Sequence, residues 1–205
     1  MKYLRLGFLA SHGGSNMQAI IDACKEGHLN AIPQVIISNN IDSLAFERAK
    51  KEGIPAFHLS SKTNPDPKEL DEAILSTLQK YDVNIVILAG YMKMLGQQSL
   101  SYYKNRILNI HPALLPKFGG KGMYGQFVHE AVMAAGEKKS GVTIHLVNEH
   151  YDQGEIVAQS RIAVLKNDTP LTLAERVLVE EHRFFPEILQ KISKGEIDLD
   201  KLASS

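Results

Sequence analysis

RILNIHPALLP, at residues 106–116, is the segment from which the fold and the chemistry are inferred most directly. Its apolar run at 107–110 predicts the end of a buried strand, and Pro112 favours an extended conformation for the residue before it. Because side chains alternate along a strand, we expect Asn109 and His111 to project from the same side. An amide donor beside an imidazole on a rigid strand end suits chemistry at a carbonyl, where charge develops on oxygen and a proton moves. Such residues at strand ends also often only satisfy backbone groups, so the pattern alone leaves both interpretations open.

Buried strands alternate with amphipathic helices on the N-terminal side of this segment. Short runs rich in Val, Ile and Leu are separated by segments with apolar residues at helical spacing. This alternation predicts βαβ units and hence a parallel sheet with helices on both faces. Ligands bind such sheets beyond the carboxyl ends of the strands, so the loops there should converge on one cleft. The expected strands are 4–10, 32–38, 54–59 and 84–89, and the expected helices are 17–24, 43–52 and 68–81.

The C-terminal half predicts two further helices and a strand pair that extends the sheet antiparallel. Period-two alternation marks the strands, and the polar turn between them carries Asp152 where the hairpin meets the cleft. We expect Pro186 to kink or divide the last helix. The whole pattern predicts an α/β fold, with residues 1–205 in one domain. The helices are expected at 126–135 and 172–194, and the strands at 140–148 and 156–164.

The amino-acid composition limits the classes of protein to which this chain can belong. Lys+Arg and Asp+Glu number 23 each, and such balance argues against a nucleic-acid partner, which would call for a basic excess. The single cysteine, Cys24, excludes an intramolecular disulfide and a cysteine-rich zinc site. No apolar run is long enough to span a membrane, and the N-terminal segment is typical of a first strand rather than a signal peptide. We therefore expect a cytoplasmic protein, either monomer or homodimer, with small-molecule partners.

A glycine-rich turn, Ser11-His12-Gly13-Gly14-Ser15-Asn16, follows the first predicted strand and precedes a helix. Free backbone N–H groups and the positive end of a helix dipole make such a turn a natural anion cradle. It lacks the lysine of a P-loop and the spacing of a dinucleotide fingerprint. A tight turn with Ser15 or Asn16 as the helix cap is an equally good interpretation.

Several dispersed motifs resemble the folate-dependent formyltransferase family. Asn109 to Pro116 and Asp152-Gln153-Gly154 carry the family signature. The motifs Gly14-Ser15-Asn16, Ala89 to Leu95, Glu175-Arg176-Val177 and Glu181-His182 resemble, more narrowly, the family members that formylate glycinamide ribonucleotide in de novo purine (IMP) biosynthesis. The resemblance covers residues 3–190.

This resemblance implies a Rossmann-like sheet, transfer of a formyl group from the co-substrate 10-formyltetrahydrofolate to the amine of glycinamide ribonucleotide, and no metal. It implies that the catalytic residues are Asn109, His111 and Asp152. The phosphate-binding residues would be Gly14, Ser15 and Asn16, with Pro112 and Glu181 also binding substrate. The folate-binding residues would be Met92, Lys93, Leu95, Leu100, Val147 and Asn148, with the turn that runs on to Asp152.

The chain departs from the family pattern in three places. Ala113 stands where a serine is common, and Pro67 stands where close relatives place an arginine for the folate glutamate tail, with Lys62 and Lys68 as possible substitutes. The loop at 117–126 is longer than in some relatives. The family resemblance also predicts a cis Leu115-Pro116 bond.

Other functions are weighed against this one. A methionyl-tRNA formyltransferase would need a basic RNA-binding domain, and a formyl-folate hydrolase an extra N-terminal domain. A phosphate-binding regulatory domain would lack Asn109, His111 or Asp152, and all three are present here. A dehydrogenase would show G-x-G-x-x-G, which this chain lacks. Of the remaining histidines, we favour a structural role for His145, whereas His12 and His129 could face either ligand or solvent.

Overall fold

The fold is known from a computed structural model that describes residues 3–203. Its seven strands form one sheet in the order β3-β2-β1-β4-β5-β6-β7. The strands are β1 (Leu4–Ala10), β2 (Ala31–Ser38), β3 (Ala56–His58), β4 (Ile85–Leu88), β5 (Ile107–His111), β6 (Lys139–Leu146) and β7 (Ile156–Ala163). The helices are α1 (Ser15–Lys25), α2 (Leu44–Glu52), α3 (Pro67–Lys80), α4 (Gln97–Tyr102), α5 (Gln126–Ala134), α6 (Pro170–Ser193) and α7 (Leu199–Leu202).

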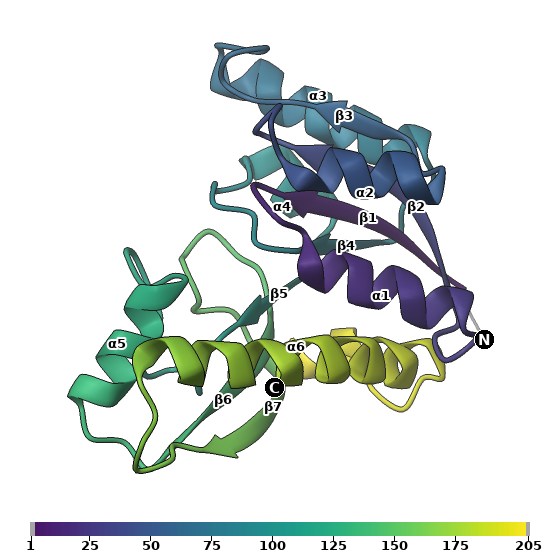
Figure 1. The fold of residues 1–205 in the computed structure, drawn as a ribbon. Helices are drawn as coiled ribbons and strands as arrows, with labels where there is room; N and C mark the ends of the chain where they lie inside the picture. Colours follow the sequence, from purple (N-terminus) through teal and green to yellow (C-terminus); the bar gives the residue numbers. More distant parts are fainter. Residues whose placement is uncertain (1–2, 204–205) are drawn as a thin grey trace.

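The sheet is parallel from β3 to β5 and antiparallel from β5 to β7. The predicted α/β class, the mostly parallel sheet and the antiparallel C-terminal pair are all confirmed. The chain order reverses between β1 and β4, which is the point at which ligands bind in open sheets of this kind. β4 and β5 lie beside this point, so the ends of all three strands open on the same region (Figure 1).

Two hydrophobic clusters cover the two faces of the sheet. On β1, Leu6 and Phe8 belong to the larger cluster and Leu9 to the smaller, as alternation along a strand requires. Helices α1, α2, α5 and α6 contribute to the larger cluster, and α3 contributes to the smaller. Gly7 faces α3, where a Cβ atom would lie 2.5 Å from the Leu78 side chain, so a glycine lets this helix pack close to the sheet.

Some local predictions differ from the structure. α6 continues through Pro186 as one helix, so the proline does not divide it. The short helices α4 and α7 were not expected. The Leu115-Pro116 bond is cis, as predicted.

Candidate active site

A cavity of about 630 Å³ lies at the carboxyl ends of β1, β4 and β5. The loop after β1 forms one wall, the segment after β4 a second, and the end of β5 the floor. Ser11 ties the first two together, because its N–H donates to the Gly90 carbonyl at 3.1 Å and its hydroxyl accepts from the Met92 N–H at 2.8 Å. The convergence of the three loops, predicted from the strand order, is confirmed.

His111 ends β5 and is buried, with a partner at each ring nitrogen. Nε2 donates to the Phe118 carbonyl at 2.7 Å, and Nδ1 lies 3.5 Å from Oδ2 of Asp152. Burial lowers the pKa of His111, although the charge of Asp152 and the Phe118 carbonyl oppose this. Since a carbonyl can only accept, the proton of the neutral ring is on Nε2. Nδ1 is therefore the nitrogen that takes up a proton, and it does so facing a carboxylate.

Asp152 lies in the turn between β6 and β7 with a left-handed backbone, at φ 56°. The Gly120 N–H donates to Oδ2 at 3.0 Å, while Nε2 of His145 lies 3.4 Å from Oδ1. Burial alone would raise the pKa of Asp152, but the nearby His145 ring, the charge of His111 and the Gly120 N–H lower it overall. Asp152 is therefore an ionised carboxylate between two imidazole rings.

Gly154 explains how this turn closes. A Cβ atom there would lie 1.8 Å from the Leu146 carbonyl oxygen, a distance that no side chain tolerates. The glycine thus lets the chain after Asp152 pass against the end of β6, which brings the carboxylate to His111.

Asn109 lies two residues before His111 on β5, and both side chains line the cavity, as alternation predicted. Asn109 Nδ2 lies 3.0 Å from Nε2 of His145, its neighbour across the β5–β6 pair. Asn109, His111, His145 and Asp152 therefore form one connected group, which we call the polar cluster.

The turn between β1 and α1 forms the second polar part of the cavity. Gly14 has φ 62°, a conformation that suits glycine, and it precedes the first turn of α1. Asn16 Nδ2 donates to Oε2 of Glu181 on α6 at 2.6 Å, which closes the cavity against the C-terminal helix. Burial raises the pKa of Glu181 to about 7, against the effect of the Asn16 hydrogen bond. We call residues 13–16 the anion cradle.

The comparisons with known proteins agree with this geometry. The formyl transferase family model matches residues 4–189. The chain belongs to this family. The resemblance predicted from the motifs is therefore confirmed.

Individual members of the family are similar over nearly the whole chain. A chloroplastic phosphoribosylglycinamide formyltransferase of Arabidopsis thaliana is 43% identical over 94% of this chain and 66% of its own length. The chain thus spans less than two thirds of the plant relatives that it matches. Phosphoribosylglycinamide formyltransferase of Haemophilus influenzae is 35% identical over 97% of this chain and 92% of its own. The crystal structure of glycinamide ribonucleotide transformylase 1 from Symbiobacterium toebii superposes with a TM-score of 0.87 at 38% identity, covering 94% of this chain and 89% of that one.

The residues that the formyltransferase resemblance implied lie around this one cavity with one exception. Leu100 lies on α4 and packs against the smaller hydrophobic cluster instead of lining the cavity. The cavity is lined by the other implied residues, Gly14, Ser15, Asn16, Met92, Lys93, Leu95, Asn109, His111, Pro112, Val147, Asn148, Asp152 and Glu181.

His145 is the residue that sequence reasoning undervalued. Its ring contacts both Asn109 and Asp152, so it belongs to the polar cluster rather than to the core alone. The available signal was its place in the predicted strand 140–148, just before the turn that carries Asp152. His12 lines the cavity, whereas His129 is buried on α5 and does not line it. The cavity is also lined by Tyr91, Lys121, Met123, Tyr124 and Leu178.

Two of the departures from the family pattern can be placed in the structure. Ala113 is buried, and its carbonyl accepts from the Thr143 hydroxyl at 2.7 Å. Pro67 begins α3 behind the Asp66 cap, and Lys62 and Lys68 are exposed outside the cavity. Within residues 3–203, no three acidic, histidine or cysteine side chains are grouped to hold a metal ion, and no helix is long and apolar enough to cross a bilayer.

Proposed function

We propose that this chain transfers a formyl group from 10-formyltetrahydrofolate to the amine of glycinamide ribonucleotide, in de novo purine synthesis. The observation that carries the proposal is that one cavity holds both the polar cluster and the anion cradle. A phosphorylated amine bound by its phosphate at residues 13–16 reaches toward Asn109 and His111 from the β1 side. The folate then enters along the segment after β4. Membership of the formyl transferase family supports the same reaction.

The reaction needs an oxyanion donor and a proton route. The amine nitrogen attacks the formyl carbon, a C–N bond forms, and the carbonyl electron pair moves onto oxygen. Asn109 donates an N–H to that oxyanion. Collapse of the tetrahedral centre breaks the bond to the folate nitrogen, which leaves with the proton that the attacking nitrogen loses. No net oxidation or reduction takes place.

His111 and Asp152 handle the proton and share in stabilising the oxyanion. In the free enzyme, Nε2–H of His111 is held by the Phe118 carbonyl. A formyl oxygen in the cavity competes with that carbonyl for the same N–H. When Nδ1 takes the proton that the attacking nitrogen loses, Asp152 stabilises the imidazolium at 3.5 Å, and the Nε2–H bond to the oxyanion becomes charge-assisted. His111 gives this proton up to the folate nitrogen as that nitrogen leaves.

The two substrates use opposite ends of the cavity. Free N–H groups at the N-terminus of α1 suit a phosphate, and Glu181 beside Asn16 suits hydroxyl groups of a ribose. Apolar side chains at the other end suit a pterin ring, with the backbone after β6 available for its polar edge. That apolar wall includes Met92, Leu95 and Val147.

The test is a spectrophotometric assay of folate deformylation with 10-formyltetrahydrofolate, with and without glycinamide ribonucleotide. Deformylation that depends on the nucleotide, together with formylglycinamide ribonucleotide as the product, is the expected result. Release of formate without the nucleotide would instead identify a hydrolase. Absence of any deformylation would overturn the proposed reaction.

A further inference from the structure

Helix α2 holds two carbonyl groups of the turn that forms the anion cradle. The hydroxyl of Ser43, the N-cap of α2, donates to the His12 carbonyl, and the Ala45 N–H donates to the same oxygen at 3.3 Å. Nε of Arg48 donates to the Gly13 carbonyl at 2.8 Å. The C=O and N–H of a trans peptide point in opposite directions. The N–H groups of Gly13 and Gly14 therefore point away from α2, on the side of the cavity that this turn lines.

These N–H groups are free to bind a ligand. Within residues 3–203, neither the Gly13 nor the Gly14 N–H donates to a protein acceptor. The Gly14 carbonyl accepts from the Gln18 N–H at 3.0 Å, which starts α1 and leaves the first-turn amides without intrahelical acceptors. The direction of this whole row of donors thus depends on where the carbonyls of His12 and Gly13 are held.

Arg48 also brings a positive charge that no carboxylate neutralises. In the part of the chain described, it makes no ion pair, whereas Arg5, Arg106, Arg176 and Arg183 each pair with an acidic residue. Its second contact is with a neutral group, because Nη1 lies 3.4 Å from Oε1 of Gln18.

Two titratable groups of α6, Glu181 and His182, supply no positive charge on this side of the molecule. Glu181, whose carboxyl group accepts a hydrogen bond from Asn16, is acidic. Burial and the charge of Arg48 together lower the pKa of His182, so this ring contributes no positive charge near neutral pH. The Arg48 guanidinium therefore provides positive charge that favours an anionic substrate at this turn.

We propose that Arg48, supported by Ser43, is a positioning residue of the phosphate subsite, which makes the enzyme select a phosphorylated amine over the same amine without phosphate. The inference rests on the proposed function for its substrate. Arg48 acts through the Gly13-Gly14 peptide and through its charge, not by contact with the reacting atoms. Its loss should therefore weaken binding of the phosphate and leave the chemical step almost unchanged.

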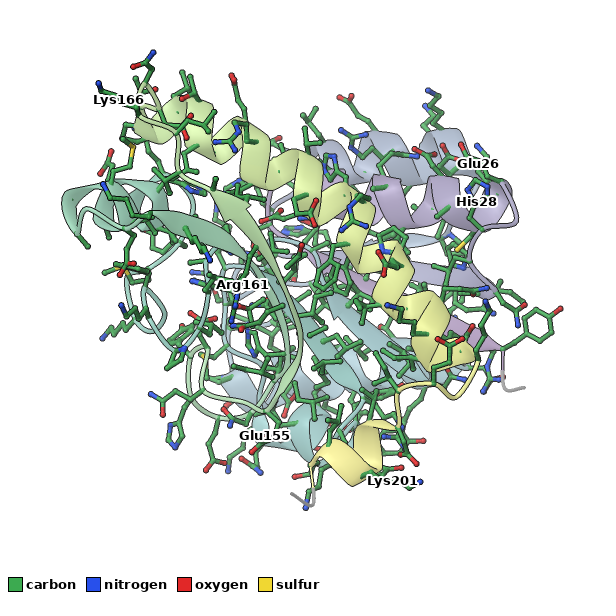
Figure 2. The ribbon with its side chains drawn as sticks, turned by 90° about the horizontal axis from the view of Figure 1, so that it is seen from below. Glu26, His28, Glu155, Arg161, Lys166 and Lys201 are labelled. Atoms are coloured by element: carbon green, nitrogen blue, oxygen red, sulfur yellow. The ribbon has the colours of Figure 1, made fainter. Side chains whose placement is uncertain are left out.

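The experiment compares glycinamide ribonucleotide with its dephosphorylated ribonucleoside at saturating folate. In Arg48→Gln, we expect KM for the nucleotide to rise about tenfold or more, as befits loss of a charge-assisted hydrogen bond, with kcat within about threefold. The value of kcat/KM for the nucleoside should not change. Arg48→Lys keeps the charge without the planar fork and should recover part of the loss. Arg161→Gln on the outer strand β7 (Figure 2) is the matched control and should behave as wild type.

The test quantity is kcat/KM for the nucleotide divided by kcat/KM for the nucleoside. If this ratio in Arg48→Gln equals that of the wild type, the proposal is overturned. If Arg48→Gln does not fold, as judged by circular dichroism, Ser43→Ala carries the test, because it removes the hydroxyl donor to the His12 carbonyl. That variant must lower the same ratio, and an unchanged ratio would equally overturn the proposal.

Binding of inorganic phosphate tests the role of Arg48 independently of the proposed reaction. We expect phosphate to raise the thermal unfolding midpoint of the wild type and of Arg161→Gln, and to do so much less for Arg48→Gln. This outcome without any formyl transfer would refute the proposed function and support the role of Arg48. Formyl transfer with equal phosphate stabilisation in all three proteins would refute the role of Arg48 alone.

Discussion

Asn109 Nδ2 lies 3.0 Å from Nε2 of His145, whose other ring nitrogen lies 2.8 Å from the Leu146 carbonyl. Because a carbonyl only accepts, the neutral ring carries its proton on Nδ1 and presents a lone pair at Nε2. Asn109 must then donate to it. One N–H of the amide is committed to His145, which fixes the amide plane and leaves the second N–H for a ligand in the cavity that both residues line.

Substitution of His145 should therefore lower turnover, because the Asn109 amide is no longer held in place. In His145→Phe, the amide can rotate, and we expect kcat to fall by about ten- to a hundredfold. Asn109→Ala removes the donor itself and should lower kcat by a factor of about 10² to 10³. His145→Gln retains an acceptor and should lie between wild type and His145→Phe. Steady-state kinetics with both substrates saturating make the comparison, and wild-type kcat in His145→Phe would refute the role given to this ring.

Removing the charge of Asp152 tests the proton route. Asp152→Asn keeps the shape of the side chain but cannot stabilise a protonated His111, so we expect kcat to fall by at least about 10². His111→Ala should cost at least as much. Both variants should retain the wild-type circular dichroism spectrum. Turnover within a few-fold of wild type in either variant would contradict the assigned roles.

Glu181 should make stability depend on pH. Burial raises its pKa to about 7, so as the pH rises the unfolded chain loses this proton first, near 4.5. The stability contributed by the neutral carboxyl is present below 4.5 and is lost as the pH rises through 7. The free energy of unfolding of Glu181→Gln, relative to wild type, should therefore be greater at pH 8 than at pH 5 by up to about 3 kcal/mol.

Urea unfolding at the two pH values measures this difference. Glu175→Gln, an exposed substitution earlier on α6, is the control and should show no such change. An equal effect of Glu181→Gln at both pH values would show that the carboxyl group is already ionised at pH 5.

Substitution of Gly154 should damage the site from a distance. A methyl group there would lie 1.8 Å from the Leu146 carbonyl oxygen, so the turn that carries Asp152 must move. We expect Gly154→Ala to lower the free energy of unfolding by about 2 kcal/mol and to reduce kcat. Glu155→Ala, at an exposed position just before β7 (Figure 2), should leave both unchanged. Unaltered stability in Gly154→Ala would show that the turn is free to adjust.

Sequence patterns predicted the sheet well because its strands carry their own signals. Runs such as Val35-Ile36-Ile37 and Ile85 to Leu88 are apolar on both faces, as buried parallel strands must be. The period-two alternation of apolar residues in β6 and β7 predicted that these two strands form the antiparallel pair. The position of Asn109 and His111 on one side of β5 followed from strand periodicity alone.

Helix α4 shows why some elements could not be predicted. Its sequence, QQSLSY, has no apolar periodicity, and its N-cap, Gly96, provides no side-chain bond. Asp71 on α3 supplies the cap instead, accepting from Gln98 N–H at 2.7 Å and Ser99 N–H at 3.2 Å. A cap from another helix leaves no local trace in the sequence. Leu100 on this helix packs against the smaller hydrophobic cluster and does not line the cavity.

The polar contacts of the candidate site were also only partly predictable from the sequence. The candidate site residues were predicted from local motifs, but their hydrogen-bond partners come from distant parts of the chain. His145 lies 36 residues from Asn109, and Glu181 lies 165 residues from Asn16. Only the fold brings these pairs together, so their hydrogen bonds and shifted pKa values were beyond any local pattern.

The hydrogen bond between Asn16 and Glu181 has a consequence for the assembly of the cavity, because it joins residues that lie 165 positions apart in the chain. Until α6 docks, this end of the cavity has only one side. A ligand that contacts both sides should therefore favour the docking of α6 against the rest of the fold.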